Sequence, residues 1–436
     1  MGTKIRFFLI ILAVLGTGSL LSQDLQRDTK VVLDDLITEA FENNSQVKAA
    51  YEEWKGSLEQ ISQAKGLPDP MLSFAHFGQN IETRLGPQRN KISLSQRIPF
   101  FGKLSLKEKI AQENSSIFKV QHAKVAADVV LQVKEAFFSL YWFEKAIGLR
   151  QEEKEVLGRL ARIAQKKYET GRSSQQDVLK AHLEISRLDE MILTLEQGKK
   201  AIETRLNALL NRPASSPFGE VGDIGERHLA LGLPEVYKLA IEGRPELKQA
   251  QHLVIKNEKS IELAKKNNWP DFTLMFEYFD IGSGATSHPD DGRNAWAGGI
   301  GFTIPLWRGK YNAAEAEAAV RLTASQKRFE DMRNDTVARV NEYYQEIKTF
   351  EDQLSLYEHS LIPQAEQALK ASEVGYLSGK VDFLDLLESE RMVLQIRTGY
   401  FKSLSDSRKS LARLERLVGQ DLVLTHNTLD LEEVTE

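Results

Sequence analysis

Two stretches of the sequence, LDDLITEAFENNSQVKAA at Leu33–Ala50 and LPEVYKLAIEGRPELKQA at Leu233–Ala250, share one pattern at an offset of 200 residues (233 − 33). Three more pairs follow in the same order, and their offset drifts only to 208 (376 − 168): Leu67–Leu72 with Trp269–Leu274, Arg97–Lys103 with Thr303–Lys310, and Tyr168–Arg172 with Tyr376–Lys380. Two helical segments can match once by chance, but four matches in one order indicate an internal repeat. We therefore expect a first repeat over 23–211, an equatorial linker over 212–232, a second repeat over 233–419 and a C-terminal tail over 420–436.

The first residues have the layout of a secretory signal peptide. Lys4 and Arg6 precede an apolar run, Phe7–Leu15, which small residues follow as far as Ser22. The alternative is a membrane anchor, but a spanning helix needs about 20 apolar residues and this run is shorter. We therefore predict a cleaved signal over 1–22 and an exported mature chain.

Composition excludes several classes of protein. The 436 residues hold 57 Lys and Arg against 62 Asp and Glu, a net charge of −5, so no basic surface for a nucleic acid is expected. There is no cysteine, which excludes disulfides, thiolate metal sites, a cysteine nucleophile and a lipid anchor on an N-terminal cysteine.

Each repeat is predicted to contain a first helix, two short strands, a very long helix, a glycine turn and a return helix. The expected first helices are Leu33–Lys65 and Leu233–Lys266, the long helices about Leu104–Tyr168 and Tyr311–Tyr376, and the return helices end near Leu210 and Val418. Val178, Ala181, Ile185, Leu188, Ile192 and Leu195 are spaced as in a coiled-coil seam.

The expected helix lengths are unusual for a globular domain. A helix of about 65 residues spans roughly 98 Å, so the first and return helices, stacked end to end, match one long helix. Pro363 lies inside the second long helix and is expected to bend or interrupt it.

The segments between the helices alternate like membrane strands. In Phe272–Asp280 the residues Phe272, Leu274, Phe276 and Tyr278 share one face, and in Trp296–Ile304 the residues Trp296, Ile300, Phe302 and Ile304 do so. In the first repeat Ile92, Leu94 and Ile98 share a face, whereas Met71–Asn80 is irregular. Nine or so residues of period two suit a strand that crosses a bilayer at a tilt.

The alternative is a pair of soluble hairpins (about 71–98 and 272–304) packed on the helices. Two hairpins at duplicate positions of an exported chain favour the membrane. Four strands cannot close a barrel in lipid, because their edges would leave unpaired backbone groups, so several copies must pool their strands. The loops Gln79–Asn90 and Ile281–Arg293 are then expected to face outward.

The chain has duplicated halves, paired hairpins, long helices and a glycine turn followed by Asp-Val-Leu or Asp-Leu-Leu. In these features it resembles the TolC-like outer-membrane channel family from about Leu33 to Gly419. The resemblance implies a mainly α fold with a small transmembrane β part. Long helical hairpins of a homotrimer would form an α-barrel tunnel in the periplasm of a Gram-negative bacterium. Four strands per chain would join a shared twelve-stranded barrel in outer-membrane lipid.

Several motifs are most similar to those of the heavy-metal-efflux branch of the family. They are Gly66–Pro70, Ile98–Lys103 and Tyr376–Leu387. Many members of that branch carry a lipid on an N-terminal cysteine, which this chain lacks. The resemblance implies a non-enzymatic exit duct of a tripartite efflux system, with a periplasmic adaptor and an inner-membrane RND-type pump as partners and heavy-metal cations as candidate cargo.

The resemblance also assigns an acidic constriction to Asp385 and Glu388, which lie three residues apart near the second helix turn. In a trimer each would give a ring of three carboxylates that attracts cations. The alternative is a solvated helix face, or an N-cap role for Asp382 or Asp385.

Other positions match the places where the family closes its tunnel. Asp177, Arg172, Tyr376 and Lys380 correspond to links between neighbouring hairpins. Gly171 and Gly379 turn the helix tips and correspond to adaptor contacts; turn chemistry alone would also explain these two glycines.

No cofactor and no metal site are expected. The eight histidines are scattered without ligand spacing, and no phosphate loop or grouped nucleophile appears. A duct for type I protein secretion or drug efflux stays open within the same family. The alternative of another class is a periplasmic coiled-coil adaptor or scaffold, which would lack the paired amphipathic hairpins.

Overall fold

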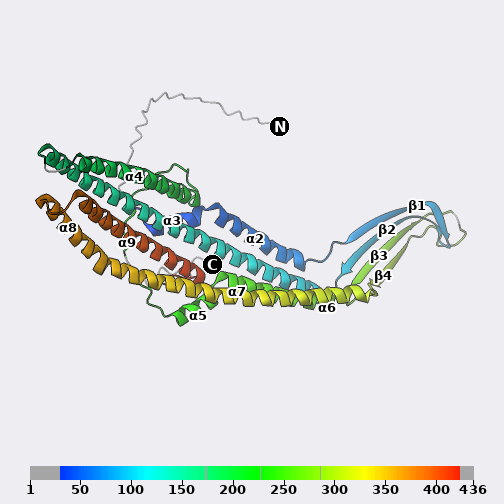
Figure 1. Cartoon of the computed structure of the whole chain (residues 1–436). Helices are drawn as coiled ribbons and strands as arrows, with labels where there is room; N and C mark the ends of the chain where they lie inside the picture. The colour runs from blue at the N-terminus through cyan, green and yellow to red at the C-terminus, as the bar shows by residue number, and fades with distance from the viewer. Residues whose placement is uncertain (1–29, 172–173, 226, 285, 423–436) are drawn as a thin grey trace, which may run out of the picture.

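The computed structural model describes residues 30–171, 174–225, 227–284 and 286–422. The predicted signal peptide, Arg172 and most of the predicted tail lie outside these ranges. Figure 1 shows an elongated molecule in which long helices run side by side and the strands lie together at one end.

The described elements alternate as the repeat predicts. In chain order they are α1 (Leu33–Asn43), α2 (Ser45–Lys65), β1 (Met71–Thr83), β2 (Gly86–Ile98), α3 (Lys103–Glu169), α4 (Gln175–Leu209), α5 (Leu233–Gly243), α6 (Pro245–Lys266), β3 (Phe272–Ile281), β4 (Ala295–Phe302), α7 (Arg308–Leu356), the π-helix η1 (Tyr357–Leu361), α8 (Ile362–Ser378) and α9 (Phe383–Val418). The predicted fold class, mainly helical with a small β part, is confirmed.

Each predicted first helix is two helices, which corrects the sequence analysis. Between α1 and α2, Asn44 has an extended backbone, and its Oδ1 caps α2 by accepting the N–H of Gln46 (2.9 Å). Its Nδ2 donates to the carbonyl of Leu209 at the end of α4 (2.9 Å). Between α5 and α6, Arg244 precedes Pro245, and a residue before proline avoids the helical region. The level of the molecule at which these two breaks lie, partway along the helical part, is called the waist below.

The long helices run the length of the helical part. α3 has 67 residues, about 100 Å, and α2 and α4 both pack along it, one after the other (Figure 1). In the second repeat η1 separates α7 from α8, two residues before Pro363. The wider π turn accommodates a proline that has no N–H and would clash with the preceding turn, so the predicted interruption is confirmed. Within the described ranges, no helix combines the length and apolar character needed to cross a membrane.

The core is a series of clusters along the helices. Leu36 of α1 and Leu206 of α4 pack around Val133 of α3 at the waist. Near the helix turns, Ala181 of the predicted coiled-coil seam packs with residues of both repeats, including Leu386 of α9. The second cluster therefore joins the two helical hairpins, α3–α4 and α8–α9, at the end far from the strands (Figure 1).

The four described strands form one antiparallel sheet in the order β1-β2-β3-β4. β2 of the first repeat pairs directly with β3 of the second, with Leu94 opposite Phe276. β1 and β4 are the two edges of the sheet.

The first hairpin has the predicted bounds, but its strands are longer and its loop shorter than expected. β1 runs to Thr83 and β2 begins at Gly86, so most of the expected outward loop Gln79–Asn90 is strand. The register shifts between His76 and Ile81, and this bulge explains why the alternation in Met71–Asn80 is irregular. The strands extend because the outer part of the hairpin pairs with itself and with β3, which the local sequence does not reveal.

Candidate functional site

The sheet has one continuous apolar face. Residues paired in register point to the same side, so the register places the alternating apolar residues of all four strands together. The face consists of Leu72, Phe74, Ile92, Leu94, Leu274, Phe276, Tyr278, Trp296 and Ile300, all exposed in the single chain. An apolar surface of this extent requires a covering, and this one is built like the outer face of a membrane sheet.

Polar and aromatic groups bound this apolar face at both ends. At the end distant from the helices, His76 Nδ1 and Asn90 Oδ1 are 2.9 Å apart, and Asn90 donates to Asp280 (2.7 Å). At the helical end, the ring of Phe100 stacks on Trp269 with centroids 5.2 Å apart. Trp296, which is 72% exposed, pairs with Tyr278, two residues before Asp280 of this polar group. Aromatic residues at both margins of an apolar band are typical of proteins in the membrane interface.

The opposite face of the sheet is mostly polar or small, with Met275 and Phe279 as its large apolar residues. Lys91 Nζ lies 2.7 Å from Glu277 across β2 and β3, and the hydroxyl oxygens of Ser73 and Ser93 are 2.6 Å apart. On β4 this face carries glycine and alanine, among them Gly299. Such a lining suits a water-filled interior.

The sheet is fixed to the helices by a buried carboxylate. Asp271, just before β3, accepts hydrogen bonds from Lys103 Nζ (2.7 Å), Arg97 Nη2 (2.7 Å) and the N–H of Phe100 (2.9 Å). Lys103 also donates to the carbonyl of Trp269 (2.9 Å). The start of α3, the end of β2 and the start of β3 therefore meet at one ionic junction.

The predicted constriction residues are exposed at the second helix turn. Asp385 and Glu388 lie in the first turns of α9, and Glu388 Oε2 is 3.8 Å from Arg391 Nη1. The N-cap is Asp382, whose Oδ1 accepts the N–H of Asp385 (2.9 Å). Asp385 is therefore not the cap, and both of its oxygens are available to solvent or cations at the helix tip.

The predicted tip glycines both take the left-handed conformation. Gly171 has φ 70° and Gly379 has φ 77°, which glycine adopts without strain. Lys380 is exposed, and its N–H donates to the carbonyl of Gly375 (2.8 Å) to close the turn. Asp177 is half-buried in the first turn of α4.

Two contacts that the sequence analysis missed join the hairpins within one chain. Lys167 of α3 donates to the carbonyl of the buried Tyr376 and lies over its ring, 3.9 Å from the centroid. Arg391 of α9 forms an ion pair with Glu184 of α4. Arg391 follows Glu388 by three residues, so the sequence indicates that local pair. Nothing in the local sequence indicates partners about 200 residues away.

The described residues contain no group of three or more Asp, Glu, His or Cys side chains placed to hold one metal ion. The histidines that do have partners belong to separate contacts, such as His252 with Glu113 (2.8 Å).

Comparisons with known proteins agree with this architecture. The family described as outer membrane efflux protein matches twice, over 36–212 and 236–420. The cobalt-zinc-cadmium resistance protein CzcC of Cupriavidus metallidurans is 21% identical over 397 residues, covering 89% of this chain and 90% of the relative. The outer membrane protein TolC of Vibrio cholerae is 20% identical over 405 residues, with coverages of 89% and 90%.

Solved structures share the fold. The crystal structure of CusC superposes with a TM-score of 0.76 at 18% identity, covering 89% of this chain and 92% of that chain. The structure of VceC from Vibrio cholerae gives 0.75 at 16% identity, with coverages of 89% and 96%. The resemblance to the TolC-like channels, near their heavy-metal branch, is confirmed. The chain therefore belongs to the outer membrane efflux protein family, with its strands in the outer membrane and its helices in the periplasm.

Proposed function

We propose that this protein is the passive exit duct of a tripartite efflux system and that it conducts heavy-metal cations delivered by an inner-membrane pump. The observation that carries the proposal is the four-stranded sheet with one apolar and one polar face at the end of helices about 100 Å long. A duct makes and breaks no bonds, so its work is to provide a path and to gate it.

The sheet edges explain why several copies are needed. In lipid the unpaired backbone groups of β1 and β4 must find partners, and β4 of one copy can pair with β1 of the next. Two copies would give eight strands, and a barrel of that size is filled by its own side chains. Three copies give twelve strands and leave room for water, which supports a homotrimer.

The acidic helix tips support a cation as cargo. Three copies of Asp385 and Glu388 would place six exposed carboxylates around the entrance, and rings of carboxylates favour cations. The name of the relative CzcC points in the same direction. The cargo then needs only weak contacts, because tight binding would stop its release.

The tips also suit a partner that opens the tunnel. Gly171 and Gly379 expose tight turns at the end far from the membrane, where a periplasmic adaptor joined to an RND-type pump would dock. The predicted links of Asp177, Arg172, Tyr376 and Lys380 to neighbouring hairpins belong to this proposal. Adaptor binding would have to favour the open arrangement over the closed one.

The test is single-channel conductance of the detergent-purified protein in a planar bilayer, with Asp385→Ala and Glu388→Ala measured beside it. We expect a small, cation-selective conductance that loses selectivity in both variants. Asp35→Ala is the matched control, because Asp35 is an exposed carboxylate on α1, at the waist rather than at the tips.

The outcomes separate the parts of the proposal. Selectivity that is unchanged in both tip variants would move the cation filter away from the tips. Selectivity for anions or none at all would favour drug or protein export over metal cations. A protein that needs no detergent and never conducts would refute the duct and favour a periplasmic scaffold.

A further inference from the structure

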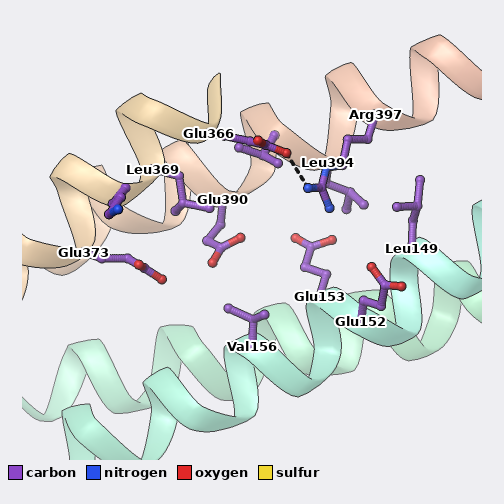
Figure 2. Close-up of a pocket in the computed structure, with 12 residues that line it drawn as sticks. Leu149, Glu152, Glu153, Val156, Glu366, Leu369, Glu373, Glu390, Leu394 and Arg397 are labelled. Atoms are coloured by element: carbon purple, nitrogen blue, oxygen red, sulfur yellow. Dashed lines mark hydrogen bonds and ion pairs between the residues drawn. The ribbon is translucent and has the colours of Figure 1, made fainter. Parts of the chain in front are cut away.

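A cavity of about 340 Å³ lies between α3, α8 and α9 and is lined by an unusual number of carboxylates. Figure 2 shows Glu153 of α3 and Glu390 of α9 pointing into it from opposite walls, with their carboxyl groups toward one another. Glu152, Glu366 and Glu373 also line the cavity. Apolar side chains of the same helices fill the remaining wall.

The two facing glutamates are buried and incompletely bonded. Glu153 is 7% exposed and Glu390 is 6% exposed. Glu153 Oε2 and Glu390 Oε1 have no hydrogen-bond partner anywhere in the part of the chain that the structure describes. A buried carboxylate without a partner is costly, so some ligand that the protein chain does not supply is expected between them.

The positive groups around the cavity are engaged elsewhere or lie at its mouth. Arg397 pairs with Glu366 (Figure 2), and Arg391 pairs with Glu184 on the neighbouring α4. Lys370 is exposed. None of these three cations forms an ion pair with either buried glutamate in the described structure.

Two arginines of α3 lie within electrostatic range of the buried glutamates, Arg150 near Glu153 and Arg159 near Glu390. Arg150 Nη1 donates to Thr398 Oγ1 (3.3 Å), which holds the guanidinium against α9. Glu373 of α8 adds a further partly exposed negative group. Each of the three helices that form the cavity therefore contributes at least one glutamate to its lining, and within the described residues neither Arg150 nor Arg159 forms an ion pair with Glu153 or Glu390.

We propose that Glu153 and Glu390 bind one divalent cation per chain, which bridges α3 and α9 inside the wall of the helical tunnel. A divalent cation matches two facing carboxylates in charge, and the cavity has room for the waters that such ions retain. Only two protein carboxylates approach the centre, so the site holds its ion weakly and water completes the coordination.

The position of the site gives the ion a structural consequence. Glu390 follows Asp385 by five residues on α9, roughly 8 Å farther from the tip. An ion between α3 and α9 would join the two hairpins just above the acidic tip. The site is thus separate from the exposed carboxylates of the entrance and fixes the helices that carry them.

The experiment counts Mn²⁺ bound to the detergent-purified full mature chain by electron paramagnetic resonance, because free hydrated Mn²⁺ gives a sharp signal that binding removes. The samples are the wild type, Glu153→Gln, Glu390→Gln, the double variant, and Glu152→Gln as the matched control. Glu152 neighbours Glu153 and lines the same cavity but is exposed. Zn²⁺ is added last as a competitor.

We expect the wild type and Glu152→Gln to bind one more Mn²⁺ per chain than the double variant, with Zn²⁺ displacing it. Each single variant should bind that ion at least about tenfold more weakly, since loss of even an outer-sphere partner costs about 10- to 100-fold. Ions on Asp385 and Glu388 contribute equally to all samples. Equal binding by the wild type and the double variant would overturn the site and leave protons to neutralise the glutamates.

The binding count does not depend on conduction. A channel that conducts but binds no extra Mn²⁺ would refute only the cation site. A chain that binds the extra ion but never conducts would refute only the duct.

Discussion

Replacing Asp271 by asparagine tests how the membrane sheet is fixed to the helical tunnel. The carboxylate faces Lys103 in a buried pair with side-chain exposures of 7% for the lysine and 9% for the aspartate. It also binds Arg97, which is 58% exposed. Asparagine keeps the shape and one acceptor but leaves the Lys103 ammonium buried without a counter-ion, with only neutral acceptors such as the carbonyl of Trp269.

The magnitude follows from burial. Removing one partner of a buried ion pair costs about 3–5 kcal/mol, and the remaining acceptors place Asp271→Asn near about 3 kcal/mol. Arg97→Gln removes a pair that is largely exposed and should cost about 1 kcal/mol or less. The double variant Lys103→Met with Asp271→Asn removes both charges, so we expect it to recover most of the loss.

The assay is guanidinium unfolding at one fixed protein concentration, because the stability of an oligomer depends on concentration. Tryptophan fluorescence reports the junction through Trp269, which stacks on Phe100, and circular dichroism reports the helices. A loss below about 1 kcal/mol in Asp271→Asn would refute the buried-charge reasoning. A double variant no more stable than Asp271→Asn would refute it as well.

Three further predictions follow from the helical part. Burial raises the pKa of both Glu153 and Glu390 to about 7 from 4.5, so the folded state binds extra protons between these values. In buffer without divalent cations, the free energy of unfolding measured by chemical denaturation should therefore fall by on the order of 5 kcal/mol as pH rises from 4.5 to 7, and much less in the doubly Gln-substituted protein. Arg391→Ala should raise open probability in bilayer recordings about fivefold, because its partly exposed ion pair with Glu184 contributes about 1 kcal/mol, and Glu184→Gln should add nothing to it. Gly379→Ala, at φ 77°, should cost about 1–2 kcal/mol in chemical unfolding and speed proteolysis at the tip, whereas unchanged stability would show that the turn relaxes.

Much of the fold is visible in the sequence because its signals are local. The strand faces follow from alternation alone, and the pairing of Phe276 with Leu94 places predicted apolar residues together. Pro363 predicts an interruption of the second long helix, because its ring and missing N–H act within one helical turn. The glycine turns are equally local, since Gly379 ends α8 by its own backbone conformation.

The parts that the sequence concealed depend on distant partners. Asn44 divides the first helix because its side chain reaches Leu209, 165 residues away. The strands of the first hairpin extend into the predicted loop Gln79–Asn90, where Asn90 donates to Asp280 of the other repeat. Neither polar residue differs locally from an ordinary surface asparagine, so only the folded chain shows its role.

The candidate site likewise contains residues that the local sequence predicts and contacts that it does not. The acidic tip residues Asp385 and Glu388 were found by their place after the glycine turn, and Asp382 is recognisable as a cap. The links Lys167–Tyr376 and Glu184–Arg391 were not found, because each joins residues 209 or 207 positions apart. A single sequence carries no information about such pairs beyond the charges themselves.

These two links bear on how the tunnel could open. Both join α3–α4 to α8–α9 inside one chain, so separation of the hairpins must break both. The Arg391 side chain is 46% exposed and that of Glu184 is 13% exposed, and a partly exposed ion pair or cation–π contact contributes about 1 kcal/mol. Two such contacts amount to about 2 kcal/mol per chain, which lies within the coupling free energy that binding of one partner typically supplies. The apolar cluster around Leu386 also joins the two hairpins, so a docked adaptor that separated them would have to open this packing as well as break the two polar links.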